Sequence, residues 1–532
     1  MTRLFTFVAV VAVLGGPSVA PGAEAPRRLC EAAKPLKRPP GAPKASDVIM
    51  RTLRLHPANA DDPHDTMRAV KQFHVTRLEW SYVTDAKFIA RLKAAGRTFG
   101  GAASAPSCLP EDPKSDWFDR VVVKDIEGRP IIAPWKRNWH RTLWGCINNA
   151  ELERGYLAYL KGYIDAGAEV MQRDEPGANR LATHWGGCFC EHCMARFRRY
   201  LAEHTSQEEC RQLGIGDIET FGYREHLKSA GAPAGDAFAR YGGGRLKELF
   251  LEFQEEATVA FHRRTRQVID EYAGRHVPFS CNNGANRWTP IQLGFDWAFG
   301  ELSYGHAQPA TIHRAMREAV RHERIQVVTM PKKGNYDNPE EWQARTRKTI
   351  ATAYAAGGLC MVPWDVFMPS NAPRYFGTPE QYADLFGFVR AAGAYLDGYE
   401  EAAALGSGIS VASFPGGPPV ALGGDAGVFA FLRARPGESE APVVIHLIDW
   451  GEPKPLKVEL RQRAFFGDKL LSVRLLTPAD YDKPAHEGAE AGGDFSKLLV
   501  DRPLPVARDG GLAAVEVPEL RPWGMLVVSP AE

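Results

Sequence analysis

Two adjacent carboxylates and a group of cysteines stand close together in the stretch QRDEPGANRLATHWGGCFCEHC, residues 172–193. The acidic pair, Asp174 and Glu175, comes shortly after the apolar run AEVM. A carboxyl group within reach of a reacting atom can donate or accept a proton in catalysis. Adjacent side chains of a strand point in opposite directions, so we expect one acid to face a site and the other the wall. Glu175 is the candidate general acid, and the alternative is a helix cap or a surface acid.

Two further acids end later apolar runs. Glu301 closes FDWAFGE, and Asp365 directly follows Trp364 in MVPWD. Hydrolysis of a glycosidic bond uses two carboxyl groups, one as the acid and one as the nucleophile or base. We therefore predict Glu301 as the second catalytic carboxylate and Asp365 as its substitute. The alternative for each is a strand-end carboxylate that pairs with a basic neighbour.

Amides, acids and aromatic residues at other such positions suit a sugar ligand. Hydroxyl groups need hydrogen-bond partners, and the face of a pyranose ring packs on indole rings. The candidate platforms are Trp80, Trp185, Trp288 and Trp364, although large buried aromatic residues more often belong to a core. The predicted substrate-binding residues are Asp174, Glu79, Trp80, Asn282, Asn283, Tyr304, His306 and Trp364.

The cysteines Cys188, Cys190 and Cys193 have a C-x-C-x2-C spacing that is typical of a metal site. Because a structural zinc ion takes four ligands, we predict Cys146 as the fourth, with Cys108 in reserve. The alternatives are a disulfide to another cysteine or free thiols. The chain has nine cysteines, an odd number, so at least one cannot form an intramolecular disulfide.

Other chemistries have less support in the sequence. It contains no phosphate-binding glycine loop, no Gly-x-Ser-x-Gly elbow and no His-Glu-x-x-His helix, and we predict no organic cofactor. A metal-dependent hydrolase built on Asp61, Asp62, His64 and Asp65 is a weaker alternative, because such short runs are more often turns. A net charge of +1 disfavours nucleic acid as a partner, since binding its phosphates needs a basic excess.

Short apolar runs alternate with amphipathic stretches between residues 48 and 405, which predicts a (β/α)8 barrel. A doubly wound sheet is disfavoured, because no glycine-rich turn follows the first run. Insertions at 106–150 and 206–243 fall on the strand-to-helix side, where barrel enzymes build their sites. The predicted strands are 48–56, 75–82, 97–104, 168–173, 277–282, 295–302, 325–331 and 358–364, and predicted helices include 191–204, 244–273 and 340–356.

The pattern changes near residue 405 to short alternating segments with Pro, Gly and Asp turns, typical of an antiparallel β-sandwich. The N-terminus has a basic residue, an apolar run from Phe5 to Leu14 and then small residues, as in a secretory signal peptide. We expect a secreted or periplasmic protein with no membrane segment after cleavage; its oligomeric state stays open. The predicted domains are signal peptide 1–25, extended lead-in 26–46, barrel 47–404 and β-sandwich 405–532.

The acidic turn followed by GCFCEHCMARFRRYL resembles glycoside hydrolase family 42, the β-galactosidase family. The run ATAYAAGGLCMVPWDVF resembles the closing strand of that family's barrel. The resemblance covers roughly residues 48–400 and implies a retaining glycosidase on a (β/α)8 barrel, with a carbohydrate substrate. It also implies that Glu175 is the general acid/base. The cysteines would hold a structural zinc ion that keeps the loop after Glu175 in place.

Two positions depart from the family pattern. Asp174 replaces the family's Asn, which holds the 2-hydroxyl group of the sugar. The strand IQVVTMPKKG lacks the Glu that the family uses as its nucleophile. β-Galactoside specificity therefore does not follow from the resemblance, and the alternative function is a carbohydrate-binding barrel that has lost catalysis.

Overall fold

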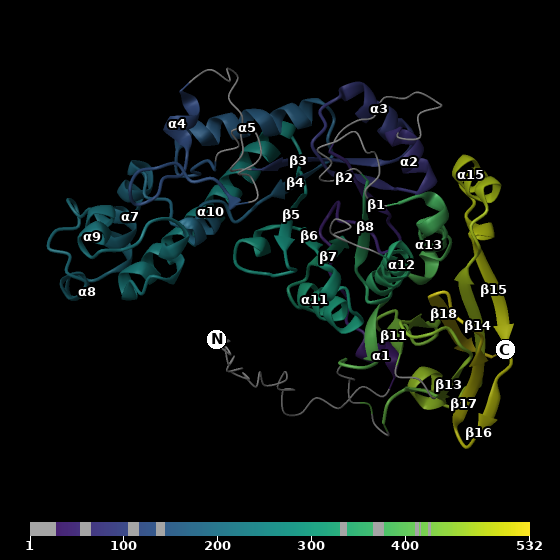
Figure 1. The fold of residues 1–532 in the computed structure, drawn as a ribbon. Coiled ribbons are helices and arrows are strands. Elements are labelled where there is room, and N and C mark those ends of the chain that lie inside the picture. Colours follow the sequence, from purple (N-terminus) through teal and green to yellow (C-terminus); the bar gives the residue numbers. More distant parts are fainter. Residues whose placement is uncertain are drawn as a thin grey trace, which may run out of the picture.

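Eight parallel strands close into a barrel in the computed structural model of the chain (Figure 1). The strands pair in sequence order, and β1 pairs with β8 to complete the ring. The predicted barrel is confirmed, and each strand overlaps its predicted range. The strands are β1 (Ile49–Arg51), β2 (Arg77–Ser81), β3 (Thr98–Ser104), β4 (Val170–Asp174), β5 (Phe279–Gly284), β6 (Trp297–Glu301), β7 (Ile325–Thr329) and β8 (Leu359–Pro363). The structure describes residues 28–53, 65–104, 116–134, 144–329, 338–364, 377–409, 414, 417–423 and 427–531.

The sequences of the barrel strands are apolar runs, because helices cover their outer face and side chains fill the interior. Every residue of β2, β7 and β8 is buried. Strand pairing places Ser104 opposite Asp174 and Glu301 opposite Thr329. The last residues of the barrel strands, with the residues that follow each, thus gather at one end, which we call the C-terminal rim.

Helices alternate with the strands and begin at short polar residues. Asp85, Asn149 and Asn338 each accept a hydrogen bond from a backbone N–H of the first turn, as helix caps do. The predicted helices 244–273 and 340–356 correspond to α10 and α12. The barrel helices are α2 (Thr66–Gln72), α3 (Ala86–Ala94), α5 (Ala150–Asp165), α10 (Gly244–Ala273), α11 (Pro309–Arg321), α12 (Pro339–Ala355) and α13 (Pro379–Ala391), with short turns η5 (Gln292–Gly294) and η6 (Tyr304–His306).

The insertions after β3 and β4 pack together beside the barrel (Figure 1). They share a hydrophobic core that is separate from the barrel core and includes Trp144, Phe189 and Phe250. We call this part the cysteine subdomain, because Cys146, Cys188, Cys190 and Cys193 lie in its core. Its elements are α4 (Trp117–Val121), α6 (Ala178–Ala182), η3 (Thr183–Trp185), α7 (Glu191–His204), α8 (Gln207–Gln212), α9 (Tyr223–Ser229) and η4 (Gly235–Arg240).

The C-terminal part forms two antiparallel sheets around one hydrophobic core, which confirms the predicted β architecture. Trp523 packs on Phe388 of α13, with ring centroids 4.9 Å apart, and joins this domain to the barrel. The six-stranded sheet has the order β15-β14-β18-β12-β11-β9 and the four-stranded sheet β10-β13-β17-β16. The elements are β9 (Glu400–Leu405), β10 (Val420–Leu422), β11 (Val428–Ala434), β12 (Val443–Asp449), β13 (Leu456–Arg461), α14 (Gln462–Phe466), β14 (Leu471–Pro478), α15 (Lys483–Gly492), η8 (Ser496–Leu498), β15 (Leu499–Leu504), β16 (Ala507–Asp509), β17 (Leu512–Val517) and β18 (Trp523–Pro530), after the turn η7 (Gly393–Tyr395).

Two sequence predictions concern the N-terminus. The predicted signal peptide, residues 1–25, lies outside the described residues. The predicted extended lead-in contains a short helix, α1 (Leu29–Ala32), which packs into the core of the C-terminal sheets. None of the helices in the described ranges has the length and apolar composition that a bilayer crossing requires.

Candidate active site

The carboxylate of Asp174 lies at the centre of the hydrogen bonds of the C-terminal rim. Asn282 of β5 donates from its amide Nδ2 to Asp174 Oδ1 at 3.1 Å. The hydroxyl of Tyr82, directly after β2, donates to Oδ2 at 2.5 Å. Burial, and then the nearby charge of Asp174, raises the pKa of Tyr82, so this hydroxyl keeps its proton and acts as a donor. Three strand ends that are distant in sequence therefore converge on one carboxylate.

Glu301 ends β6 and shares this environment. Burial raises the pKa of Glu301, Arg51 at the end of β1 opposes the shift, and the charge of Asp174 adds to it. Such effects decay with distance, so the three side chains act on one another across the rim. A carboxyl group with a raised pKa is suited to hold a proton that it can donate.

Glu175 lies just beyond β4 and has a left-handed backbone, with φ of 54°. Its backbone N–H donates to Asp174 Oδ1 at 2.9 Å, and its carboxylate accepts a hydrogen bond from Ser104 Oγ at the end of β3. Its charge also raises the pKa of Tyr82. Because β4 ends at Asp174, strand alternation does not fix the direction of the Glu175 side chain, and the expectation that the two acids point to opposite faces stays a prediction.

Several predicted sugar-binding residues have other roles. Glu79 is 1% exposed; its carboxylate accepts hydrogen bonds from Arg77 Nε and, at 3.1 Å, from Trp297 Nε1. Asn283 is buried, and its amide donates to Gln326 Oε1 of β7 at 2.8 Å. These side chains are occupied inside the barrel and do not fit a role in binding substrate. Only Asn282 of the two adjacent amides reaches the rim carboxylate.

The tryptophans named as sugar platforms are largely core residues. Trp80 is 1% exposed, and the guanidinium of Arg51 lies 3.6 Å from its ring centroid. Trp364 is fully buried against Phe73, with ring centroids 6.0 Å apart. Trp185 packs on Trp144 in the cysteine subdomain. A sugar ring could not stack on these three indoles in this arrangement, whereas Trp288 is partly buried at the edge of the barrel core.

The remaining predicted site residues take no part in the hydrogen bonds around Asp174 or lie outside the described residues. His306 is exposed, and its Nδ1 lies 2.6 Å from Ser303 Oγ. Asp365 and the side chain of Tyr304 lie outside the described residues. Of the alternative metal cluster, Asp65 caps α2 by accepting from Arg68 N at 2.6 Å, and Asp61, Asp62 and His64 lie outside the described residues.

Sequence reasoning missed Arg51, Tyr82 and Ser104. All three stand at the end of a barrel strand or directly after it. The strand-end rule that selected Asp174 and Glu301 applies to them equally, but it was applied mainly to acids, amides and tryptophans.

The four cysteines of the predicted metal site meet in the core of the cysteine subdomain. The sulfur atoms of Cys146, Cys188, Cys190 and Cys193 all lie within 4.8 Å of one another, and all four residues are buried. Cys146 Sγ lies 3.5 Å from Cys193 Sγ and 3.6 Å from Cys190 Sγ. Zn–S bonds of about 2.3 Å place tetrahedral sulfur ligands ~3.8 Å apart, so the donor set fits zinc. Cys146 is confirmed as the fourth member, and Cys108 lies outside the described residues.

Hydrogen bonds from two amides support this cluster. Asn179 Nδ2 donates to the sulfurs of Cys146 and Cys193, both at 3.3 Å, and Asn148 Nδ2 donates to Cys193 Sγ at 3.2 Å. Donors of this kind stabilise thiolates and orient metal ligands. The side chain of the neighbouring His192 is half-buried and lies near Glu191, and it is not part of the cluster.

The same subdomain holds the loop that follows the acidic pair. Trp144 Nε1 donates to the carbonyl of Ala178 at 3.1 Å, and the backbone N–H of Ile147 donates to Asn179 Oδ1 at 3.1 Å. From the other side, His262 Nε2 lies 2.7 Å from the carbonyl oxygen of Pro176. The cysteine cluster and α10 thus fix the segment directly after Glu175.

The closed barrel with carboxyl groups at its C-terminal rim has the architecture of a (β/α)8-barrel enzyme. In sequence the chain is distantly related to glycoside hydrolases. The α-agarase of Thalassotalea agarivorans is 26% identical over 303 residues, which cover 51% of this chain and 20% of the relative. The α-agarase of Alteromonas agarilytica is 26% identical over 305 residues, which cover 51% and 21%. The matched region is thus about a fifth of each relative's length.

Two other comparisons concern families and solved structures. No protein-family model matches the chain. A cycloisomaltooligosaccharide glucanotransferase of Paenibacillus sp., solved in complex with cycloisomaltoheptaose, superimposes with a TM-score of 0.53 at 9% identity. The match covers 91% of this chain and 85% of that structure, and it shows similarity of fold alone.

Proposed function

We propose that the protein is a glycoside hydrolase that cleaves an oligo- or polysaccharide by two-carboxylate chemistry. The observation that carries this proposal is that Asp174 and Glu301 end two parallel strands, β4 and β6, at the C-terminal rim of a closed barrel. The similarity to α-agarases supports it and favours agar or a related polysaccharide as the substrate.

The environments of the carboxyl groups favour a division of roles that differs from the sequence prediction. Glu301, whose pKa is raised by burial, is the proposed general acid that protonates the leaving oxygen. Asp174, with hydrogen bonds from Tyr82 and Asn282, is the proposed nucleophile or base. Glu175, whose carboxylate accepts a hydrogen bond from Ser104 Oγ, is the alternative candidate for the general acid.

Substituting each carboxyl group tests these roles on a panel that includes agar oligosaccharides and aryl glycosides. Glu301→Gln is expected to lower kcat/KM by about 10²–10⁴-fold on natural linkages. The same substitution should lower kcat/KM far less on 2,4-dinitrophenyl glycosides, because their leaving group needs no proton. Asp174→Asn should reduce the hydrolysis of both kinds of substrate.

The matched control is Glu323→Gln, the same change at an exposed residue before β7, at the opposite end of the barrel. It should leave the kinetics unchanged. A large loss in Glu175→Gln with no loss in Glu301→Gln would return the acid role to Glu175. Sugar binding by the wild type without turnover of any substrate would favour the non-catalytic alternative.

The pH dependence of kcat/KM gives an independent test. A general acid must be protonated, so activity falls as pH rises through the pKa of Glu301, which burial holds above 4.5. Arg51 lowers this pKa, so Arg51→Met should move the alkaline limb of the profile to higher pH. Arg51→Lys, which keeps the charge, should leave it near the wild-type position. A shift of the limb to lower pH in Arg51→Met would contradict the assignment.

We also propose that the four cysteines hold one structural zinc ion. The buried sulfur cluster and its amide donors support this, whereas sulfurs of a catalytic site would need access to substrate. Metal analysis should find about one zinc ion per chain, which Cys193→Ser should lose, with a fall in Tm of roughly 5–15 °C. Cys210→Ser is the control, because Cys210 is buried in the same subdomain but contacts Thr205. Full zinc content in Cys193→Ser would refute the site.

Membership of glycoside hydrolase family 42 remains a hypothesis. The cysteine cluster after the acidic turn favours it. The end of β7 does not, because β7 ends at Thr329 and supplies no acid within the described residues. β-Galactoside specificity therefore has no support from the rim.

Export is a further proposal, and residues 1–25 are its support. Expression of the full chain in a bacterial host should yield a periplasmic or secreted protein whose N-terminal sequence begins between residues 21 and 26. Recovery of the uncleaved chain in the cytoplasm alone would contradict export.

A further inference from the structure

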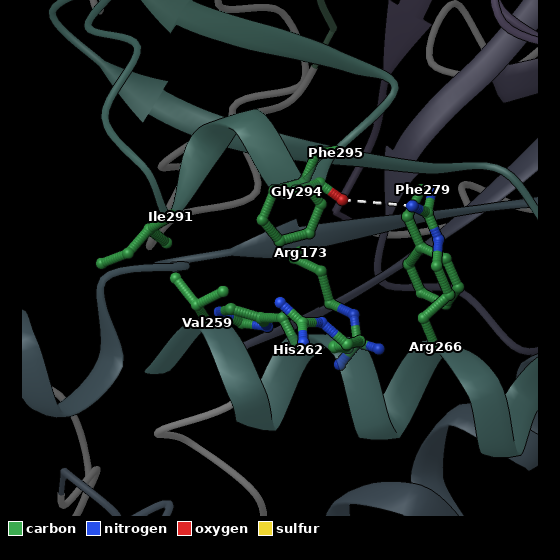
Figure 2. Close-up of a pocket in the computed structure, with 9 residues that line it drawn as sticks. Arg173, Val259, His262, Arg266, Phe279, Ile291, Gly294 and Phe295 are labelled. Carbon is green, nitrogen blue, oxygen red and sulfur yellow. Dashed lines mark hydrogen bonds between the residues drawn. The ribbon is translucent and has the colours of Figure 1, made fainter. Parts of the chain in front are cut away.

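A small basic pocket lies outside the barrel wall, between β4, β5 and α10 (Figure 2). Its volume is about 240 Å³. Pockets that enclose drug-sized ligands measure roughly 300–1,000 Å³, so this one suits a smaller occupant. The lining residues are Arg173, Val259, His262, Arg263, Arg266, Phe279, Ile291, Gly294 and Phe295.

Arg173 is the deepest charged group of this pocket. It points away from the rim and is 1% exposed. Its Nη2 donates to Thr265 Oγ1 at 2.9 Å, but Nε and Nη1 have no hydrogen-bond partner among the described residues. Burial lowers the pKa of Arg173, and the neighbouring Tyr156 opposes that shift. Guanidinium N–H groups left without acceptors in a buried position are costly, so an external acceptor would stabilise them.

Two further arginines of α10 add positive charge. Arg266 Nη1 donates to the carbonyl of Gly294 at 3.1 Å, and Arg266 forms an ion pair with Asp296. Its Nε has no partner in the described part of the chain. Arg263 is exposed at the mouth of the pocket. Three guanidinium groups against one carboxylate leave a positive excess that favours an anion.

The ring of Phe279 positions two of these groups. The guanidinium carbons of Arg173 and Arg266 lie 4.5 Å and 5.4 Å from its centroid. Stacking on an aromatic face orients the planar fork of a guanidinium group, which matches the oxygens of a tetrahedral oxyanion. The pocket therefore presents ordered donors and not only charge.

His262 supplies a hydrogen-bond acceptor, in contrast to the donors of the arginines. Burial, and then the charge of Arg173, lowers the pKa of His262 to about 3, so the ring is neutral near pH 7. Its Nε2 lies 2.7 Å from the carbonyl oxygen of Pro176, which can only accept, so Nε2 carries the proton. Nδ1 is then an acceptor, and it has no donor among the described residues.

We propose that this pocket binds inorganic phosphate in its hydrogen phosphate form. The oxygens of that ion accept from the arginines, and its remaining O–H can donate to His262 Nδ1. Sulfate offers the same shape without a proton at neutral pH and is expected to bind more weakly. The pocket lies behind β4, on the opposite side of the strand from Asp174, and is distinct from the proposed carbohydrate site.

Equilibrium dialysis of the full-length protein with radiolabelled phosphate, at fixed ionic strength, tests the proposal. The wild type should bind about one phosphate per chain, saturating below about 10 mM. Arg173→Leu should abolish this binding. Arg263→Gln removes a charge from the exposed mouth, leaves the core intact, and should weaken binding by about three- to tenfold.

The matched control is Arg264→Gln, the next residue of α10, whose side chain pairs with Glu153 outside the pocket. Phosphate affinity should not change in this variant. The absence of saturable binding, or equal binding by wild type and Arg173→Leu, would overturn the proposal. Tighter binding of sulfate than of phosphate would overturn the acceptor role of His262 and the choice of ion.

Discussion

A single carboxylate, that of Asp174, organises the C-terminal rim of the barrel. The oxygens of a partly buried carboxyl group need hydrogen-bond partners, because burying them without partners is costly. Tyr82 and Asn282 supply them from two other strand ends, and the backbone N–H of Glu175 supplies a third. The last of these bonds accompanies the left-handed turn at Glu175, so the same carboxylate ties the rim together and ends β4.

β4 separates two chemically different environments. Arg173 and Asp174 are adjacent and point to opposite sides of the strand, as alternation requires. The acidic rim therefore lies on one side, and a basic pocket lies on the other. Pro176 follows both, and its carbonyl contacts His262 of that pocket. The long insertions therefore have a structural role. The cysteine subdomain and α10 support the loop beyond Glu175 from two directions.

The barrel and the cysteine cluster could be predicted from sequence because their signals are local. Apolar runs bounded by turns mark buried parallel strands, and the C-x-C-x2-C spacing places three thiols close together on one turn. The direction of a side chain at a strand end, by contrast, depends on how the strand pairs with its neighbour, which the pattern of nearby residues does not show. The register between β2 and β3 shifts between Leu78 and Ser81, and Trp80 within this irregularity has φ of 53°. A pattern of residue types cannot reveal that shift, so Glu79 and Trp80 were placed at the rim although they belong to the interior.

The strand-end rule supplies three carboxyl groups at the rim but cannot rank them, because Asp174, Glu175 and Glu301 satisfy it equally. Their surroundings distinguish them. Glu301 lies in a poorly solvated position that favours the protonated form. Asp174 accepts hydrogen bonds on both oxygens, from Tyr82 and Asn282, which hold its carboxylate in one orientation. The proposed reaction needs two acids in different environments, because one group must give a proton and the other acts as nucleophile or base. The proposed division of roles rests on burial and hydrogen bonding, which only the folded chain provides.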